Sequence, residues 1–241
     1  MDSNNYYNNV PYSAAQVENE LTLQKYVAAV MRRVYGKMTL GLLTTAVVSF
    51  LILSSSTLLQ LIFSSKIVFW VLALAELGVV IYLSARIEKL STATASALFY
   101  VYSMLNGVVL APIFFVYTGA SIALTFAITA GTFGAMCIFG YVTKQDLSKI
   151  GAILFMALIG LILATVVNLF VGSDTLSMVI SWVGVLIFVG LTAWDTQKIK
   201  KWAAMSDQSM VGKVATMGAL SLYLDFINLF LYLLRIFGRD N

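Results

Sequence analysis

The chain has 241 residues, of which 60% are hydrophobic and only 11% are charged, and its formal net charge is +4. A globular domain usually has about 25% charged residues, so this chain has too few polar side chains to cover a water-exposed surface. Its excess apolar surface requires lipid, which excludes an intrinsically disordered chain and a disulfide-built secreted scaffold. The composition therefore predicts an integral membrane protein.

The chain contains no histidine and a single cysteine. A zinc site built from Cys and His is excluded, and so is a Ser-His-Asp triad, because the necessary side chains are missing. Any response to protons near neutral pH must therefore come from carboxylates. The net charge predicts no nucleic-acid partner, since basic residues beside membrane spans account for it.

Apolar runs separated by charges predict seven transmembrane helices. One crossing takes about 20 residues, so the charge-free run 90–143 crosses twice, with a hairpin at Tyr117-Thr118-Gly119. Another turn is expected at Gly172-Ser173-Asp174. The expected helices cover residues 36–60, 66–86, 93–117, 119–142, 149–172, 176–199 and 213–237. The predicted fold class is an all-α polytopic membrane protein, because the runs lack the alternation of a β-barrel.

The expected domain boundary lies just before the first span. Residues 1–35 form a polar N-terminal segment and residues 36–238 form the seven-helix domain. Within the first segment, residues 16–35 have a helical pattern with two alternatives. They form an interfacial helix on anionic headgroups, or they extend the first span into water. We find no cleavable signal peptide, because residues 1–12 are polar and rich in Asn and Tyr.

Lysine and arginine are distributed unevenly over the two sides of the membrane. Twelve of the 15 lie on one side: Lys25, Arg32, Arg33 and Lys37 before or at the start of the first span, and eight in or beside the loops after the second, fourth and sixth spans. The positive-inside rule therefore predicts a cytoplasmic N-terminus and a C-terminus outside. The short loops favour a bacterial inner membrane over the endoplasmic reticulum.

Two sequence features bear on packing. Small residues recur every four positions in the fourth expected helix, which predicts that this stripe packs closely against a neighbour. They are Gly119, Ala123, Ala127, Gly131 and Ala135. Pro112 is expected to bend the third helix, because it removes one backbone hydrogen bond.

Three acidic residues fall within expected spans: Glu76, Asp195 and Asp225. An ionised carboxylate in hydrocarbon costs several kcal/mol unless it is paired, hydrated or protonated. Asp225 belongs to a polar stripe along one face of the last helix, which comprises Ser221, Asp225, Asn228, Tyr232 and Arg235. This stripe is expected to face the bundle interior and to line a permeation path, or else to hold the bundle together through hydrogen bonds.

The other two acids have structural alternatives. Asp195 could be an exposed interfacial acid that pairs with Lys198, one helical turn away. Glu76 could be a protonated, hydrogen-bonded acid in a helix contact, or part of a proton relay. Arg86 ends the 66–86 helix on the same side as Asp195, so it could pair with Asp195 or anchor its helix to headgroups.

Several motifs resemble those of the Bax inhibitor family, the transmembrane Bax inhibitor motif proteins. The longest is the segment 219–230, Ala-Leu-Ser-Leu-Tyr-Leu-Asp-Phe-Ile-Asn-Leu-Phe. Others are the segment 192–199, the loop 140–148, Ala75-Glu76-Leu77-Gly78 and Ser84-Ala85-Arg86. The resemblance covers about residues 25–238, and the long polar N-terminus departs from it.

The resemblance implies a seven-helix bundle with the last helix at its centre and a calcium leak that responds to pH. It implies that Asp195 and Asp225 form the sensor and that Arg86 is a latch pairing with Asp195 when the path is closed. Glu76 matches the family's glutamate in the second span. Two neighbouring carboxylates share a proton, and Ca²⁺ prefers such oxygen ligands, so protons and Ca²⁺ would compete for Asp195 and Asp225.

Two other functions compete with the channel. The chain could be an interaction protein that modulates a membrane protease or cell-death and stress regulators, without a flux of its own. An intramembrane aspartyl protease also needs two acids, but the Gly-rich context expected around the second acid is absent near Asp225. We therefore predict no enzymatic activity and no cofactor, with the bilayer, protons and Ca²⁺ as partners besides any membrane protein.

Overall fold

The computed structural model describes residues 14–239, and the predicted polar segment 1–12 lies outside them. Seven helices in the described chain are long and apolar enough to cross a membrane, which confirms the all-α polytopic fold. The helices are α1 (Ala14–Leu53), α2 (Ser56–Phe63), α3 (Lys66–Arg86), α4 (Thr92–Leu110), α5 (Ile113–Val116), α6 (Gly119–Val142), α7 (Ser148–Val171), α8 (Asp174–Met205) and α9 (Val211–Phe237), and η1 (Gln208–Met210) is a 3-10 turn.

The first span differs from its predicted limits at both ends. Helix α1 is continuous from Ala14 to Leu53, so residues 16–35 extend the first span, and Val30 and Val34 on this extension are buried. The predicted helix 36–60 is interrupted at two serines. Ser54 donates to Phe50 O (2.8 Å), and Ser55 accepts from Leu58 N–H to begin α2. Serine side chains that bond local backbone groups commonly end one helix and begin another.

The third span is broken at its proline rather than bent. Helix α4 ends at Leu110, and the four-residue helix α5 follows Pro112. Proline lacks an N–H and disfavours helical geometry in the residue before it, so the chain restarts in a new direction. The two predicted hairpins form as expected. Thr118 and Ser173 cap α6 and α8 respectively, and Gly172 takes the left-handed conformation (φ 66°) that ends α7.

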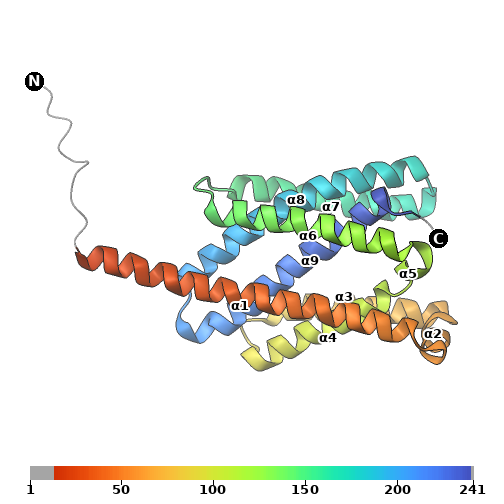
Figure 1. Ribbon diagram of the computed structural model, residues 1–241, viewed down its shortest axis with the longest axis horizontal. Helices are drawn as coiled ribbons and strands as arrows, with labels where there is room; N and C mark the ends of the chain where they lie inside the picture. Colours follow the sequence, from red (N-terminus) through yellow and green to blue (C-terminus); the bar gives the residue numbers. More distant parts are fainter. Residues whose placement is uncertain (1–13, 240–241) are drawn as a thin grey trace, which may run out of the picture.

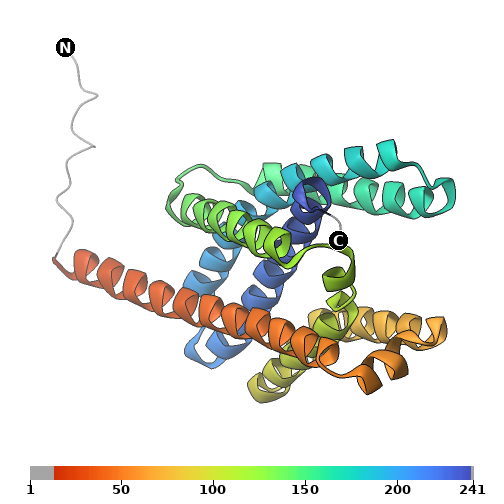
Figure 2. The same cartoon turned by 45° about the vertical axis from the view of Figure 1, so that its right-hand side comes forward.

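Helix α9 occupies the centre of the bundle, as the family resemblance implied. It lies between a group formed by α1, α3 and α4 and a second group formed by α6, α7 and α8 (Figure 1; Figure 2). Its 18-residue apolar window is 67% buried, compared with 11% in α3 and α7. Helices α3 and α7 therefore present most of their surface to lipid.

The prediction that the small-residue stripe on α6 packs against a neighbouring helix is wrong. Gly119, Ala123, Ala127, Gly131 and Ala135 are all exposed on the outside of the bundle. The buried face carries Ser121, Thr125, Thr129, Phe133, Cys137 and Gly140 instead. At the end of this face, Gly140 lies directly against the backbone of Ala193 on α8. The close helix approach therefore exists, but a single glycine on the opposite face makes it.

Candidate functional site

Helices α8 and α9 carry the two aspartates of the sequence-predicted site into one cavity of about 510 Å³. The walls come from α3, α7, α8 and α9, and most of the lining side chains are apolar. The polar members of the wall are Asp195, Lys198, Ser221, Asp225, Asn228 and Tyr232. Two acids from different helices are thus brought together inside an otherwise apolar part of the bundle.

Asp225 is 4% exposed, and its Oδ2 atom has no hydrogen-bond partner within residues 14–239. The nearest charges that act on it are Asp195 and Lys198. A buried carboxylate oxygen without a partner is costly unless it holds a proton or binds a cation or water. The cavity therefore has one carboxylate oxygen available for such a ligand.

Asp195 is 9% exposed, so the alternative of an exposed interfacial acid is wrong. Its ionic partner is nevertheless the expected Lys198, with Nζ 3.5 Å from Oδ1. The ammonium group of Lys198 also lies over the rings of Trp194 and Trp202, at 4.6 and 4.7 Å from their centroids. These aromatic faces hold the cation next to the acid.

The predicted Arg86–Asp195 ion pair is not formed in this structure. Arg86 is exposed at the end of α3, and the ion pairs among the described residues are Lys198–Asp195 and Lys201–Asp146. Lys198 lies one turn from Asp195 on the same helix, so it meets the acid without any movement of α3.

The polar stripe on α9 follows the sequence prediction over most of its length. Ser221, Asp225, Asn228 and Tyr232 line the cavity, whereas Arg235 is exposed near the end of the helix and is not part of its wall. Asn228 donates its side-chain amide N–H to Leu224 O (2.8 Å). The stripe extends the polar surface from Asp225 by about one helical turn toward Ser221 and by about two turns toward Tyr232.

Glu76 does not join the aspartates but belongs to a separate hydrogen-bond network. Asn106 on α4 donates to Glu76 Oε1 (2.5 Å), and Tyr223 on α9 donates to Asn106 Oδ1 (3.0 Å). The Tyr223 hydroxyl is also 2.5 Å from Thr45 Oγ1 on α1. The network links α3, α4, α9 and α1, so Glu76 is a hydrogen-bonded acid in a helix contact.

A third polar contact was missed by the sequence reasoning. Lys37 on α1 donates to Ser96 on α4 and to Thr216 on α9, the latter at 3.0 Å. The sequence indicates only that Lys37 is one of the basic residues on the predicted cytoplasmic side of the membrane. The position of Lys37 could have predicted this contact. Lys37 lies directly before the first charge-free run, where its long side chain can reach hydroxyl groups on neighbouring helices.

Gln197 on α8 holds the loop between α6 and α7. Its Oε1 accepts from Leu147 N–H (2.9 Å), and its Nε2 donates to Gln145 O (2.8 Å). Next to it, Lys201 donates to Asp146 (2.6 Å), which lowers the pKa of Asp146 to about 2. The loop and the Asp195 segment are therefore one connected unit.

We expect Gln197→Leu to release this loop. The loss of both hydrogen bonds should speed hydrogen exchange of the Leu147 amide by about tenfold, as one net hydrogen bond is worth about 1.4 kcal/mol. Exchange measured by mass spectrometry in micelles checks this. Lys201→Gln is the control, because it removes only an exposed ion pair and should change the rate by less than about twofold. Equal effects of the two variants would contradict the role of Gln197.

The donor set of the cavity is too small for a resident metal centre. Within residues 14–239 no three His, Cys, Asp or Glu side chains gather as metal ligands, and Lys198 adds a positive charge beside the two aspartates. Ca²⁺ usually takes 6–8 oxygen ligands, and the two carboxylates supply only part of such a set.

The seven spans and the buried pair Asp195 and Asp225 place the chain among the multi-pass α-helical membrane proteins that bury acidic side chains between their helices. The sequence model of the family described as "Inhibitor of apoptosis-promoting Bax1" matches residues 27–241. The chain belongs to this family, the Bax inhibitor family, and is a bacterial member of it, which confirms the resemblance found in its motifs.

Several relatives cover most of the chain. It is 49% identical over 232 residues to the inner membrane protein YbhL of Escherichia coli K12, a match that spans 95% of this chain and 97% of YbhL. An uncharacterized protein of Borreliella burgdorferi is 46% identical over 211 residues, covering 87% and 91% of the two chains. An uncharacterized membrane protein of Streptococcus pyogenes serotype M1 is 39% identical over 212 residues, covering 87% and 92%.

Proposed function

We propose that the protein is a pH-sensitive leak channel for Ca²⁺ in which Asp195 and Asp225 form the sensor. The observation that carries this proposal is the shared cavity, where Asp225 Oδ2 lacks a hydrogen-bond partner among the described residues. Both acids come from adjacent helices, so a proton or a cation bound between them changes the force between α8 and α9. Ca²⁺ is the transported ion in this scheme, not a cofactor.

Protons and Ca²⁺ compete in this mechanism. The doubly ionised pair attracts a divalent cation, while a shared proton removes one of its two negative charges, and thermodynamic linkage makes the competition reciprocal. Oxygen ligands for a passing ion come from the two carboxylates, with Ser221, Asn228 and Tyr232 continuing the polar face. Glu76 acts outside this path, through its network to Tyr223.

Gating follows from the charge on Asp195. When ionised, this acid attracts Lys198, and in the closed path it also attracts Arg86, which then latches α3 to α8. Protonation removes both attractions, so flux rises as pH falls. We propose that the protein lies in a bacterial inner membrane with its N-terminus in the cytoplasm and its C-terminus outside, as the distribution of basic residues favours.

Flux from the purified protein tests the proposal. Full-length protein is reconstituted in liposomes with an internal Ca²⁺ indicator, and flux is measured between pH 5 and 8 beside protein-free liposomes. We expect protein-dependent Ca²⁺ flux that increases by up to about tenfold per pH unit of acidification for a gate linked to one proton. Folded protein without flux at any pH would instead favour the alternative, an interaction protein that modulates other membrane proteins.

A further inference from the structure

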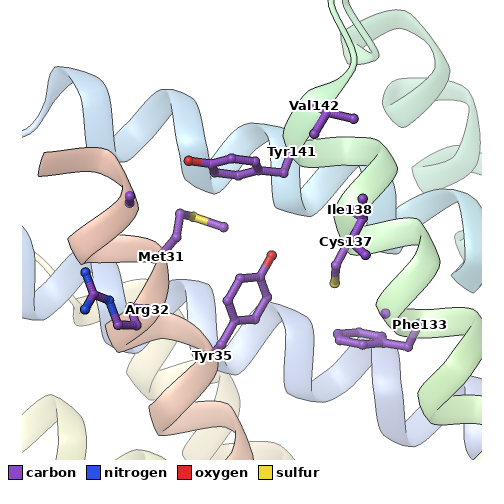
Figure 3. Close-up of a pocket in the computed structure, with 10 residues that line it drawn as sticks. Met31, Arg32, Tyr35, Phe133, Cys137, Ile138, Tyr141 and Val142 are labelled. Atoms are coloured by element: carbon purple, nitrogen blue, oxygen red, sulfur yellow. The ribbon is translucent and has the colours of Figure 1, made fainter. Parts of the chain in front are cut away.

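A second cavity, of about 570 Å³, lies between α1 and α6 and contains none of the acids of the proposed channel. Figure 3 shows Met31 and Tyr35 on α1 facing Phe133, Cys137 and Tyr141 on α6, while Arg32 extends away from α6. Its walls are almost wholly apolar. Ile138 and Val142 on its rim are 66% and 63% exposed, so this cavity, the α1–α6 groove, opens toward the lipid.

The dimensions of the groove match one lipid leaflet. Along α6 it extends from Phe133 to Val142, which corresponds to about 14 Å at 1.5 Å per residue. The hydrocarbon core of a bilayer is about 30 Å thick, so the groove spans about half of it. Val142 is the last residue of α6, so the groove runs from the membrane boundary inward to Phe133.

One of the residues that line the groove, Arg32 on α1, carries a positive charge. Arg32 extends away from Phe133 (Figure 3), is exposed, and forms no ion pair with the other described residues. An arginine guanidinium binds phosphate oxygens with two parallel hydrogen bonds. No acidic side chain among the described residues pairs with this guanidinium.

We propose that the α1–α6 groove is a binding site for an anionic phospholipid, with one acyl chain against Phe133 and Ile138 and the phosphate on Arg32. Charge complementarity selects this occupant over a second copy of the chain, which would place two Arg32 guanidinium groups close together. The site shares no lining residue with the cavity of the two aspartates and is independent of the proposed Ca²⁺ flux.

Native mass spectrometry of the full-length protein tests the headgroup. Protein in detergent is titrated with phosphatidylglycerol or phosphatidylcholine of identical chains, and retained lipid is counted. We expect about tenfold stronger retention of phosphatidylglycerol, lost in Arg32→Gln. Arg33→Gln is the matched control, because Arg33 lines a different pocket, and it should retain the preference. Equal retention of the two lipids, or equal losses in both variants, overturns the site.

Filling the groove tests the acyl chain. A Cβ on Gly134 meets nothing within 4 Å, so Gly134→Phe places its ring in the groove and should abolish retention. Gly131 is equally open but lies outside the groove, so Gly131→Phe should retain the lipid. Retention by Gly134→Phe at the wild-type level overturns the proposal, as does a groove covered by a second copy in a dimer that excludes lipid.

A third test uses the wild-type protein, so its result does not depend on whether a variant folds. Cys137 lines the groove and is the only cysteine of the chain. Its alkylation by N-ethylmaleimide should slow at least about fivefold when the protein is saturated with phosphatidylglycerol rather than phosphatidylcholine, since an occupied site protects its wall. Equal alkylation rates with the two lipids overturn selective occupancy of the groove.

Discussion

Replacing Asp225 by asparagine should abolish the pH dependence of Ca²⁺ flux between pH 5 and 8. The amide has the shape of the acid but cannot exchange a proton in this range, so the pair loses its titration. Asp195→Asn should have the same effect, because a shared proton needs two carboxylates and either variant leaves only one. In both variants, we expect flux to vary by less than about twofold over a range in which the wild type varies by at least about tenfold.

The matched control for these variants is Asp146→Asn. Asp146 lies in the α6–α7 loop, where the hydrogen bond from Lys201 lowers its pKa to about 2 from an ordinary value of 3.8. The attraction between Asp146 and Lys201 is fully present above pH 3.8, the ordinary pKa of an aspartate, and is lost only as pH falls through about 2. Asp146 therefore stays ionised from pH 5 to 8, and Asp146→Asn should leave the pH response unchanged. A double variant, Asp195→Asn with Asp225→Asn, that keeps the wild-type response would show that the sensor lies elsewhere.

The second large effect is expected at Gly140. A Cβ at this position would overlap the backbone of Ala193, and neither helix can yield by rotating a side chain. Gly140→Leu must push α6 away from α8, at a cost of about 3 kcal/mol or more. Thermal unfolding in detergent should show a melting temperature lower by about 6–12 °C. Because α8 carries Asp195 two positions after Ala193, the displacement should also disturb the carboxylate pair.

Gly131→Leu provides the comparison for this prediction. It makes the same change on the same helix, but a Cβ there meets nothing within 4 Å. Its melting temperature should stay within about 2 °C of the wild type, since surface substitutions usually cost less than about 0.5 kcal/mol. Equal destabilisation by the two variants would mean that helix propensity, and not the contact with Ala193, decides the outcome.

The sequence was sufficient to predict the number of spans and the buried position of Asp225, because a carboxylate in the middle of an apolar run has few acceptable environments. The residues alone left Asp195 open as an exposed interfacial acid, and only the family resemblance implied that the two aspartates lie together. The stripe from Ser221 to Tyr232 was predicted correctly because helical spacing fixes which residues share a face.

Contacts between helices were harder to predict from the sequence. The periodicity of α6 shows which residues share a face but not whether that face looks toward protein or lipid, and both environments are apolar. The small-residue stripe was therefore placed inward, while Gly140 made the close approach from the other face. Side chains with hydroxyl or amide groups, such as Thr45 and Asn106, are common in membrane spans. The sequence therefore does not show which of them come close enough to form hydrogen bonds in the network of Glu76.

The central position of α9 has a consequence for how the protein is made. The most enclosed helix is synthesised after the other six spans, and its apolar stretch has a lower mean hydropathy (1.6) than that of the peripheral α7 (2.8). Helices α1, α4, α6 and α8 all pack against α9, so none of them can reach its final neighbours before α9 has been synthesised. Truncation before α9 should therefore leave a chain that enters the membrane but whose six remaining spans lack a common core.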